Sequence, residues 1–248
     1  MGAEDVRRRE RRFYDDQAAV PPPPRAPDEY DLALLEALGP LEELRVLELG
    51  CGRGDLTLEL LRRGAEVVAV DMSPAMVALA RGRAPEARFL VAPVEETGLD
   101  SAGFDRVVGK WILHHADVPD TGREVARLLR RGGRAAFFEN QDRNPLLRSA
   151  RRGLWRLGRG GTVGTPDERP LSRADLDELV EIFGRIELSY PSFYFFEALS
   201  RALGHRAYGP LRSLDAAVWR RLPAARRYGY HVLIQLSGTA DRAPRPRP

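Results

Sequence analysis

The chain has 248 residues and a formal net charge of +3, and 43% of its residues are hydrophobic while 30% are charged. These proportions are ordinary for a globular protein and argue against a largely disordered chain. The single cysteine, Cys51, excludes an internal disulfide and an all-cysteine metal site. No apolar run reaches about 18 residues and none follows the N-terminal arginines, so we expect no transmembrane helix and no secretory signal. A cytoplasmic location is therefore predicted.

The positive charge does not indicate a nucleic-acid partner. Lys110 is the only lysine, and the many arginines alternate with Asp and Glu over most of the chain. A nucleic-acid-binding surface concentrates its basic residues in one stripe instead. We therefore predict no nucleic-acid partner. Peripheral contact of the arginine-flanked apolar segments around residues 201–221 with a membrane stays open, and nothing in the sequence fixes an oligomeric state.

The N-terminal part is predicted to be helical. A charged, mostly exposed helix over residues 5–19 should end at the prolines 21–24, which form a stiff spacer. A second helix over 28–38 should bury Leu32, Leu35 and Leu38 and end at Gly39.

From residue 45 onward short apolar strands alternate with helices. Strands are predicted over 45–49, 66–70, 88–91, 104–108, 134–139, 185–190 and 228–237. The expected helices cover 56–63, 74–83 (capped by Ser73), 121–129 and 171–183, and a turn is expected at 132–133. The last helix should be capped by Ser172 and Asp175 and should bury Leu176, Leu179, Val180 and Phe183. This alternation predicts an α/β fold with a doubly wound sheet, mostly parallel with an antiparallel last strand, plus helical cap insertions.

A glycine-rich turn follows the first of these strands. Gly50, Gly52 and Gly54 are spaced as G-x-G-x-G, so that the backbone can turn tightly and approach a ligand closely. Asp55 stands where a dinucleotide fingerprint would have its last glycine, which argues against an NAD-dependent reductase. Glu48, two residues before the turn, suits a ligand that carries an ammonium group.

The next strand ends in an acid, Asp71, 17 positions after Gly54. A carboxylate at that place can accept hydrogen bonds from both hydroxyls of a ribose. Met72 follows it and can pack against an adenine ring.

In these residues the sequence resembles the class I S-adenosylmethionine-dependent methyltransferases, over about residues 44–140. The resemblance rests on E-L-G-C-G-R-G (48–54), V-D-M-S-P (70–74), F-D-R-V-V (104–108), L-H-H (113–115) and L-L-R-R-G-G-R (128–134). It implies a Rossmann-like fold and S-adenosyl-L-methionine as cofactor. The methionine portion would lie against Gly50, Cys51, Gly52 and Gly54, its amino group near Glu48, and the ribose on Asp71. Pro93 replaces the family's usual adenine-binding acid or amide, so Val94 or Glu95 would take that contact, or the contact is absent.

Catalytic candidates lie at the ends of the fourth and fifth strands. Methyl transfer is an in-line displacement, and a base is useful only when the nucleophile carries a proton. His115 is the preferred base because imidazole titrates near neutral pH, although L-H-H can simply shape the helix that follows. Lys110, also a cofactor-binding candidate or a chance surface lysine, and Glu139 are the other catalytic candidates. Substrate-binding candidates are Tyr14, Trp111, His114, Asn140, Arg143 and Tyr194, and no metal site is predicted.

The chain is predicted to be divided into a core and several additions. The expected parts are an N-terminal helical cap and linker (1–30), a cofactor-binding core (31–145), a mobile insertion (146–170), a core helix and strand (171–190), a helical lid insertion (191–227), the last core strand (228–240) and a disordered tail (241–248). The aromatic stretch 193–196 either caps an apolar acceptor or packs the insertion against the sheet.

Together these features predict S-adenosylmethionine-dependent transfer of a methyl group to a small, apolar or aromatic acceptor, by O-, N- or C-methylation. The N-P-P-Y or D-P-P-Y stretch of amino-methylating nucleic-acid enzymes is missing, and Cys51 lies inside the glycine turn rather than at a nucleophile's place. The alternative is a S-adenosylmethionine-binding fold that serves non-methylating natural-product chemistry or regulatory binding.

Overall fold

The computed structural model describes residues 3–20, 23, 25–149, 169–193, 195–196 and 208–237. The predicted proline spacer at 21–24, apart from Pro23, lies outside these residues, as do most of the predicted insertion (146–170), part of the predicted lid (191–227), Tyr194 and the predicted tail.

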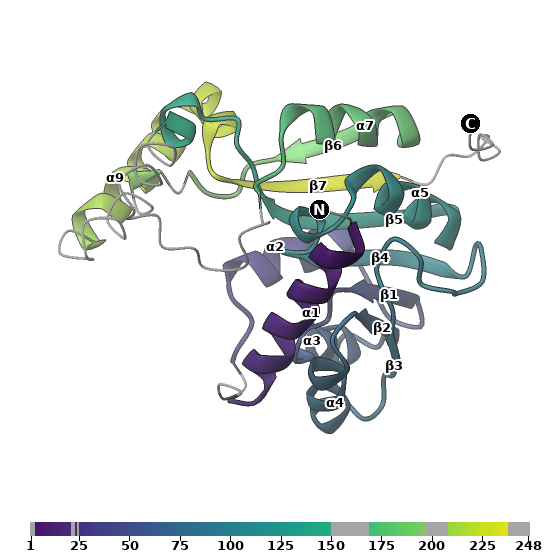
Figure 1. Cartoon of the computed structure of the whole chain (residues 1–248). Coiled ribbons are helices and arrows are strands. Elements are labelled where there is room, and N and C mark those ends of the chain that lie inside the picture. The colour runs from purple at the N-terminus through teal and green to yellow at the C-terminus, as the bar shows by residue number, and fades with distance from the viewer. Residues whose placement is uncertain are drawn as a thin grey trace.

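The described strands form one seven-stranded sheet in the order β3-β2-β1-β4-β5-β7-β6 (Figure 1). Among them only β7 runs antiparallel to its neighbours, which confirms the predicted mostly parallel sheet with a reversed last strand. The strands are β1 (Arg45–Leu49), β2 (Glu66–Asp71), β3 (Arg88–Val91), β4 (Phe104–Lys110), β5 (Leu129–Asn140), β6 (Ile186–Ser189) and β7 (His231–Ser237).

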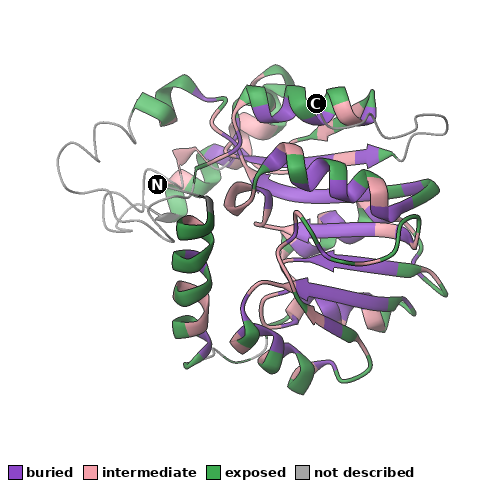
Figure 2. Cartoon of the chain, turned by 45° about the vertical axis from the view of Figure 1, so that its right-hand side comes forward, coloured by how far each residue is buried: buried purple, intermediate pink, exposed green. Residues whose placement is uncertain are grey.

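Helices cover both faces of this sheet. Figure 2 shows the buried strands lying between helices whose outer sides are exposed. Adjacent strand residues alternate between two apolar cores: Val107 and Phe137 belong to one, Val108 and Phe138 to the other. The first core is closed by α5 (Val118–Leu128) and α7 (Arg173–Phe183), the second by α2 (Glu29–Leu38), α3 (Asp55–Arg62) and α4 (Pro74–Arg83).

Two predicted helix faces are partly wrong. In α2 the buried leucines are Leu34, Leu35 and Leu38, whereas Leu32 is 48% exposed. Successive residues turn by about 100° around a helix, so Leu32 lies about 110° from the centre of the stripe that the other three form. In α7 Val180 lies at the edge of the buried stripe and is 39% exposed, for the same angular reason.

The prediction that a turn at Gly132 and Gly133 separates the preceding helix from the fifth strand is also wrong, because β5 already begins at Leu129. Leu129 pairs with Phe104, and the register then shifts before Arg106 pairs with Arg134. Gly132 has a φ of +77°, a left-handed conformation that suits glycine. The two glycines therefore form an irregularity inside one long strand.

An N-terminal helix, α1 (Ala3–Ala18), lies across one end of the sheet and packs beside α4 (Figures 1 and 2). The 3₁₀ turn η1 (Leu113–His115) follows β4 at the same end. The helix α9 (Tyr208–Arg221) and the turn η2 (Pro223–Tyr228) precede β7. Among the described residues no helix is both long and apolar enough to cross a bilayer.

Candidate active site

A cavity of about 690 Å³ lies where the carboxyl ends of β1, β2 and β4 meet the helix α1. This volume is within the usual range for small-molecule sites, and the carboxyl end of the strands is where open α/β sheets bind their ligands. The cavity brings together most of the predicted site residues, which are Tyr14, Glu48, Gly50, Cys51, Gly52, Asp71, Met72, Val94, Glu95, Lys110, Trp111 and His115.

The glycine turn shapes one wall of the cavity. Gly50, Gly52 and Gly54 have φ values of +71°, +49° and +82°, all left-handed. A Cβ atom on Gly50 would lie 2.7 Å from the Ile112 side chain, and one on Gly54 would lie 3.1 Å from the Ala80 side chain. A Cβ on Gly52 would meet nothing within 4 Å. Gly50 and Gly54 are thus required for close packing, while Gly52 keeps the backbone open toward a ligand.

Glu48 is a buried acid at the end of β1. Its Oε2 accepts a hydrogen bond from the Thr57 hydroxyl, and only 2% of the residue is exposed. Burial raises the pKa of Glu48 to about 8, opposed by the Thr57 hydrogen bond and reinforced by the nearby Asp71. A cation bound in the cavity would favour the ionised carboxylate, so this position fits an ammonium group.

Asp71 is hydrogen-bonded to the backbone of the glycine turn. Its Oδ2 accepts a hydrogen bond from the Gly52 amide at 2.8 Å, and its Oδ1 accepts one from the Ser73 amide at 2.9 Å. Burial raises the pKa of Asp71, and these two amide donors oppose the shift. Each carboxylate oxygen has more than one acceptor site, so Asp71 keeps capacity for ligand hydroxyls.

The segment after β3 contributes Val94 and Glu95 to the cavity, while Pro93 does not line it. The Glu95 Oε1 accepts a hydrogen bond from the Asp117 amide at 3.2 Å and lies 3.5 Å from Nη2 of Arg7 on α1. Val94 is buried. These two residues are therefore the ones available to an adenine ring at this strand end.

Lys110 is part of a partly buried ion cluster rather than a chance surface lysine. Its Nζ donates to both carboxylate oxygens of Asp28 at 2.9 Å and to Oδ1 of Asp31 at 2.7 Å. The Arg25 Nη1 donates to the other oxygen of Asp31 at 2.6 Å. Burial opposes ionisation of Asp31, but the Arg25 and Lys110 hydrogen bonds hold its pKa at about 2. Lys110 thus joins β4 to the start of α2.

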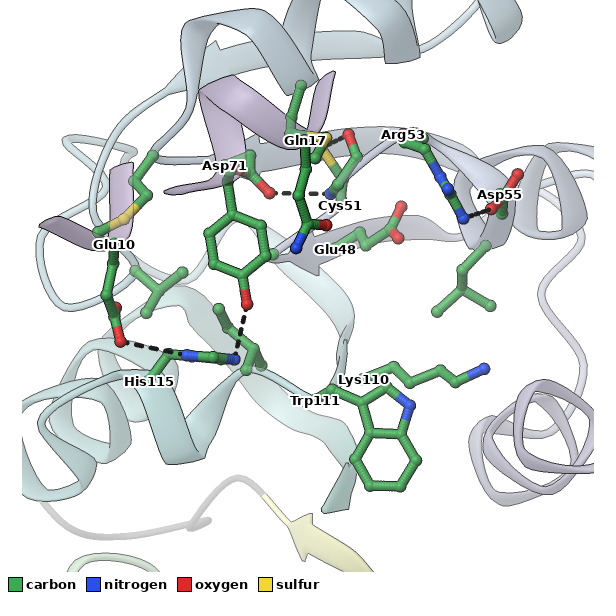
Figure 3. A pocket seen from close by; sticks show the side chains of 18 of the residues that line it. Glu10, Gln17, Glu48, Cys51, Arg53, Asp55, Asp71, Lys110, Trp111 and His115 are labelled. Carbon is green, nitrogen blue, oxygen red and sulfur yellow. Dashed lines mark hydrogen bonds and ion pairs between the residues drawn. The ribbon is translucent and has the colours of Figure 1, made fainter. Parts of the chain in front are cut away.

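His115 lies between two side chains of α1 (Figure 3). Its Nδ1 is 3.2 Å from Oε1 of Glu10, and its Nε2 is 3.0 Å from the Tyr14 hydroxyl. The His115 side chain is 9% exposed and the Glu10 side chain 2%. Two elements that are distant in sequence therefore meet at this ring.

The other catalytic candidate, Glu139, is not brought into the cavity. It is fully buried, and its Oε1 accepts hydrogen bonds from the Ile112 and Leu113 amides at 2.7 Å each. Its Oε2 lies 2.7 Å from Nδ1 of His114. Glu139 and His114 therefore fix the turn η1 that carries His115.

Four more predicted residues do not line the cavity, namely Gly54, His114, Asn140 and Arg143. The Arg143 Nη1 instead donates to the Tyr190 hydroxyl at 3.2 Å. Tyr194 lies outside the described residues.

Sequence reasoning missed the acids and amide that α1 contributes, above all Glu10. Asp16 and Gln17 of the same helix also line the cavity, as do Arg25, Asp28, Asp31 and Asp55. A polar residue on a charged, exposed helix has no periodic signal that marks it as part of a site. Within the described part of the chain, no group of three or more His, Cys, Asp or Glu side chains is placed to hold a metal ion.

Comparison with known proteins identifies a matching family model and a similar protein. Residues 47–137 match the family model described as "Methyltransferase domain". An uncharacterised methyltransferase of Mycobacterium tuberculosis is 32% identical over 184 residues, which cover 74% of this chain and 73% of that protein.

Two solved structures share the fold. The geranyl diphosphate C-methyltransferase of Streptomyces coelicolor, in complex with S-adenosyl-L-homocysteine, superposes with a TM-score of 0.65 at 16% identity and covers 96% of this chain and 100% of that one. The [4+2]-cyclase SpnF superposes with a TM-score of 0.63 at 18% identity, covering 95% and 97%.

Proposed function

The chain belongs to the class I S-adenosylmethionine-dependent methyltransferases, and from that premise we propose that it methylates a small acceptor with an apolar or aromatic body. The observation that carries the proposal is the convergence of Glu48, Asp71 and His115 on one cavity. The first two suit the cationic and sugar portions of the cofactor, and the third suits the acceptor.

The residues around the glycine turn fit S-adenosylmethionine. Glu48 would face the amino group, Asp71 the ribose hydroxyls, and the open side of Gly52 the methionine chain. Val94, Met72 and the Glu95 region would enclose the adenine. When bound, the cofactor supplies an electrophilic methyl group on a sulfonium.

The acceptor would lie on the far side of the methyl group, between η1 and α1. Trp111, Ile112 and Ala116 give this part of the cavity an apolar wall. Trp111 has a φ of +57°, a conformation that is costly for a bulky residue and that recurs at functional sites. His115 is the side chain here that is suited to take a proton from the acceptor.

Calorimetric titration with S-adenosylmethionine and S-adenosylhomocysteine tests the cofactor site. Asp71→Asn should weaken the binding of both about tenfold or more, because hydrogen bonds to a charged group contribute about 1.5–3 kcal/mol. The matched control is Asp177→Asn, which removes a carboxylate that is 66% exposed on α7. A folded wild-type protein that binds neither compound would contradict the proposal.

Transfer of labelled methyl to a panel of small aromatic and isoprenoid acceptors tests the reaction itself.

A second candidate function, non-methylating chemistry, rests on the similarity to SpnF. That protein shares the fold, but its name describes a [4+2]-cyclase and not a methyltransferase. Tight cofactor binding with no labelled product from any acceptor would favour that non-methylating alternative.

A further inference from the structure

We propose that Glu10 of α1 orients His115 as the base for an acceptor whose nucleophile is a phenolic hydroxyl. This inference rests on the proposed function. It adds a positioning residue, Glu10, and a chemical class of acceptor.

Two contacts of the His115 ring favour one tautomer. Glu10 is buried, and its Oε1 lies 3.2 Å from Nδ1. A carboxylate beside Nδ1 favours the tautomer with the proton on Nδ1, which leaves the lone pair on Nε2. Nε2 then accepts a hydrogen bond from the Tyr14 hydroxyl at 3.0 Å. The basic nitrogen therefore faces Tyr14, which lines the cavity.

Charged and aromatic groups lie around the His115 ring. Glu10 and Tyr14 approach from α1, and Asp71 at the end of β2 interacts with His115 through its charge. Glu95 lines the same cavity, and the His114 ring stacks on His115 with centroids 4.1 Å apart. His114 is itself held by Glu139. Two carboxylates, Glu10 and Asp71, thus interact with the ring, and a third, Glu95, lines the same cavity.

The Tyr14 contact indicates the kind of acceptor. A phenol hydroxyl already occupies hydrogen-bonding distance of Nε2, with its ring edge-on to the imidazole at 84°. An acceptor phenol that replaces this hydroxyl would place its oxygen beside the base and its ring among Trp111, Ile112 and Ala116.

In the proposed transfer, the phenol oxygen would form a bond to the methyl carbon while the carbon–sulfur bond breaks, and the electron pair of that bond would stay on sulfur to give S-adenosylhomocysteine. The hydroxyl proton passes to Nε2 of His115, and the resulting imidazolium is stabilised by the Glu10 carboxylate. The proton later leaves to solvent.

The packing of α1 brings Glu10 and Tyr14 to the His115 ring. Besides Glu10 and Tyr14, the helix is held by Asp15, whose Oδ1 accepts hydrogen bonds from the Ser73 hydroxyl and the Ala75 amide. The Arg7 contact with Glu95 adds a further tie. Glu10 is therefore a positioning residue, because it acts through His115.

The first test needs no acceptor. Nitrogen-15 NMR of histidine-labelled protein, with S-adenosylhomocysteine bound, reports which ring nitrogen carries the proton, and His115→Asn assigns the signal. We expect the Nδ1-protonated tautomer in the wild type and in the control Glu4→Gln, which alters an exposed acid of the same helix. Glu10→Ala should give a mixture of tautomers. An Nδ1-protonated ring that persists unchanged in Glu10→Ala would overturn the inference.

The second test uses 1-naphthol and 1-naphthylamine, which share a ring system and differ in the nucleophilic atom. Labelled methyl should appear on the naphthol, and Glu10→Ala and His115→Ala should each lower its kcat, by about tenfold and about a hundredfold, with little change in the KM for S-adenosylmethionine. Glu10→Gln, whose amide oxygen can still accept from Nδ1, should retain part of the rate. Equal transfer to the amine, or a kcat that Glu10→Ala leaves unchanged, would overturn the inference. Where neither probe reacts, the NMR result decides, and a wild type that does not bind S-adenosylhomocysteine contradicts the proposed function instead.

Discussion

At Glu48, burial and ligand charge have opposite effects on the carboxyl group. Burial favours its neutral form, whereas a cationic ligand would favour its ionised form. The protein keeps this acid at the end of β1 with 2% exposure and a pKa of about 8, against an ordinary value of 4.5. In the unfolded chain Glu48 would lose its proton near its ordinary pKa of 4.5, several pH units below the folded value. Between about pH 5 and pH 8 the folded state therefore binds more protons than the unfolded state.

The free energy of unfolding should fall as pH rises through that window, because stability decreases with pH wherever the folded state holds the extra proton. Glu48→Gln cannot ionise, so its urea midpoint should fall less between pH 5 and pH 8, and the variant should be more stable than the wild type at pH 8. Urea denaturation followed by circular dichroism measures this. The control is Glu66→Gln, at an exposed acid in β2. Parallel pH profiles of wild type and Glu48→Gln would show that Glu48 does not retain its proton.

At the scale of single elements, the start of α7 shows how a short sequence pattern becomes a stable helix end. Ser172 caps the helix, and Asp175 completes the capping box by accepting a hydrogen bond from the Ser172 amide at 2.7 Å. Burial opposes ionisation of Asp175, but the two hydrogen bonds from Arg169 and those from Ser172 hold its pKa at about 2. The predicted cap is confirmed.

Asp175→Asn should therefore destabilise the protein by about 1 kcal/mol at pH 7, the usual size of a helix-cap loss. Because the pKa of Asp175 is lowered on folding, its contribution is present above about pH 4 and is lost as pH falls toward 2. Urea midpoints of wild type and variant should converge over that range. Asp177→Asn, at an exposed acid of the same helix, should stay within about 0.5 kcal/mol of the wild type at each pH. A constant difference from pH 7 to pH 2 would contradict the assignment.

At the scale of the whole molecule, the cavity is bounded both by the sheet and by α1. A ligand held there stabilises the folded state by an amount that depends on its concentration relative to Kd. At a hundredfold excess over Kd this is about 2.7 kcal/mol, which for a chain of this length raises Tm by roughly 5–10 °C.

S-adenosylhomocysteine should therefore raise Tm progressively with concentration in a thermal unfolding assay, whereas NADH should not, because the glycine turn and Glu48 do not suit a pyrophosphate. Glu48→Gln with S-adenosylhomocysteine should show a smaller rise. An equal rise with NADH would indicate a general nucleotide site.

Much of the fold could be predicted from local patterns. The bounds of β1, β3 and α4 were predicted as they occur, and the Ser73 and Ser172 caps were confirmed, because strand periodicity and capping depend on residues within a few positions of each other. The faces of α2 and α7 were only partly predicted. Which residues at the edge of a helical stripe are buried depends on the neighbouring elements.

By itself the sequence determined the fold class, the family and the position of the glycine turn with Glu48 and Asp71, since all of these are local motifs in a fixed order. Only the tertiary structure decided that Glu139 supports η1 instead of lining the cavity, that Lys110 ties β4 to α2, and that Glu10 contacts His115. Glu10 and His115 are 105 residues apart, and no local pattern couples positions at that distance. Their contact exists because chain folding brings α1 to the carboxyl ends of the strands.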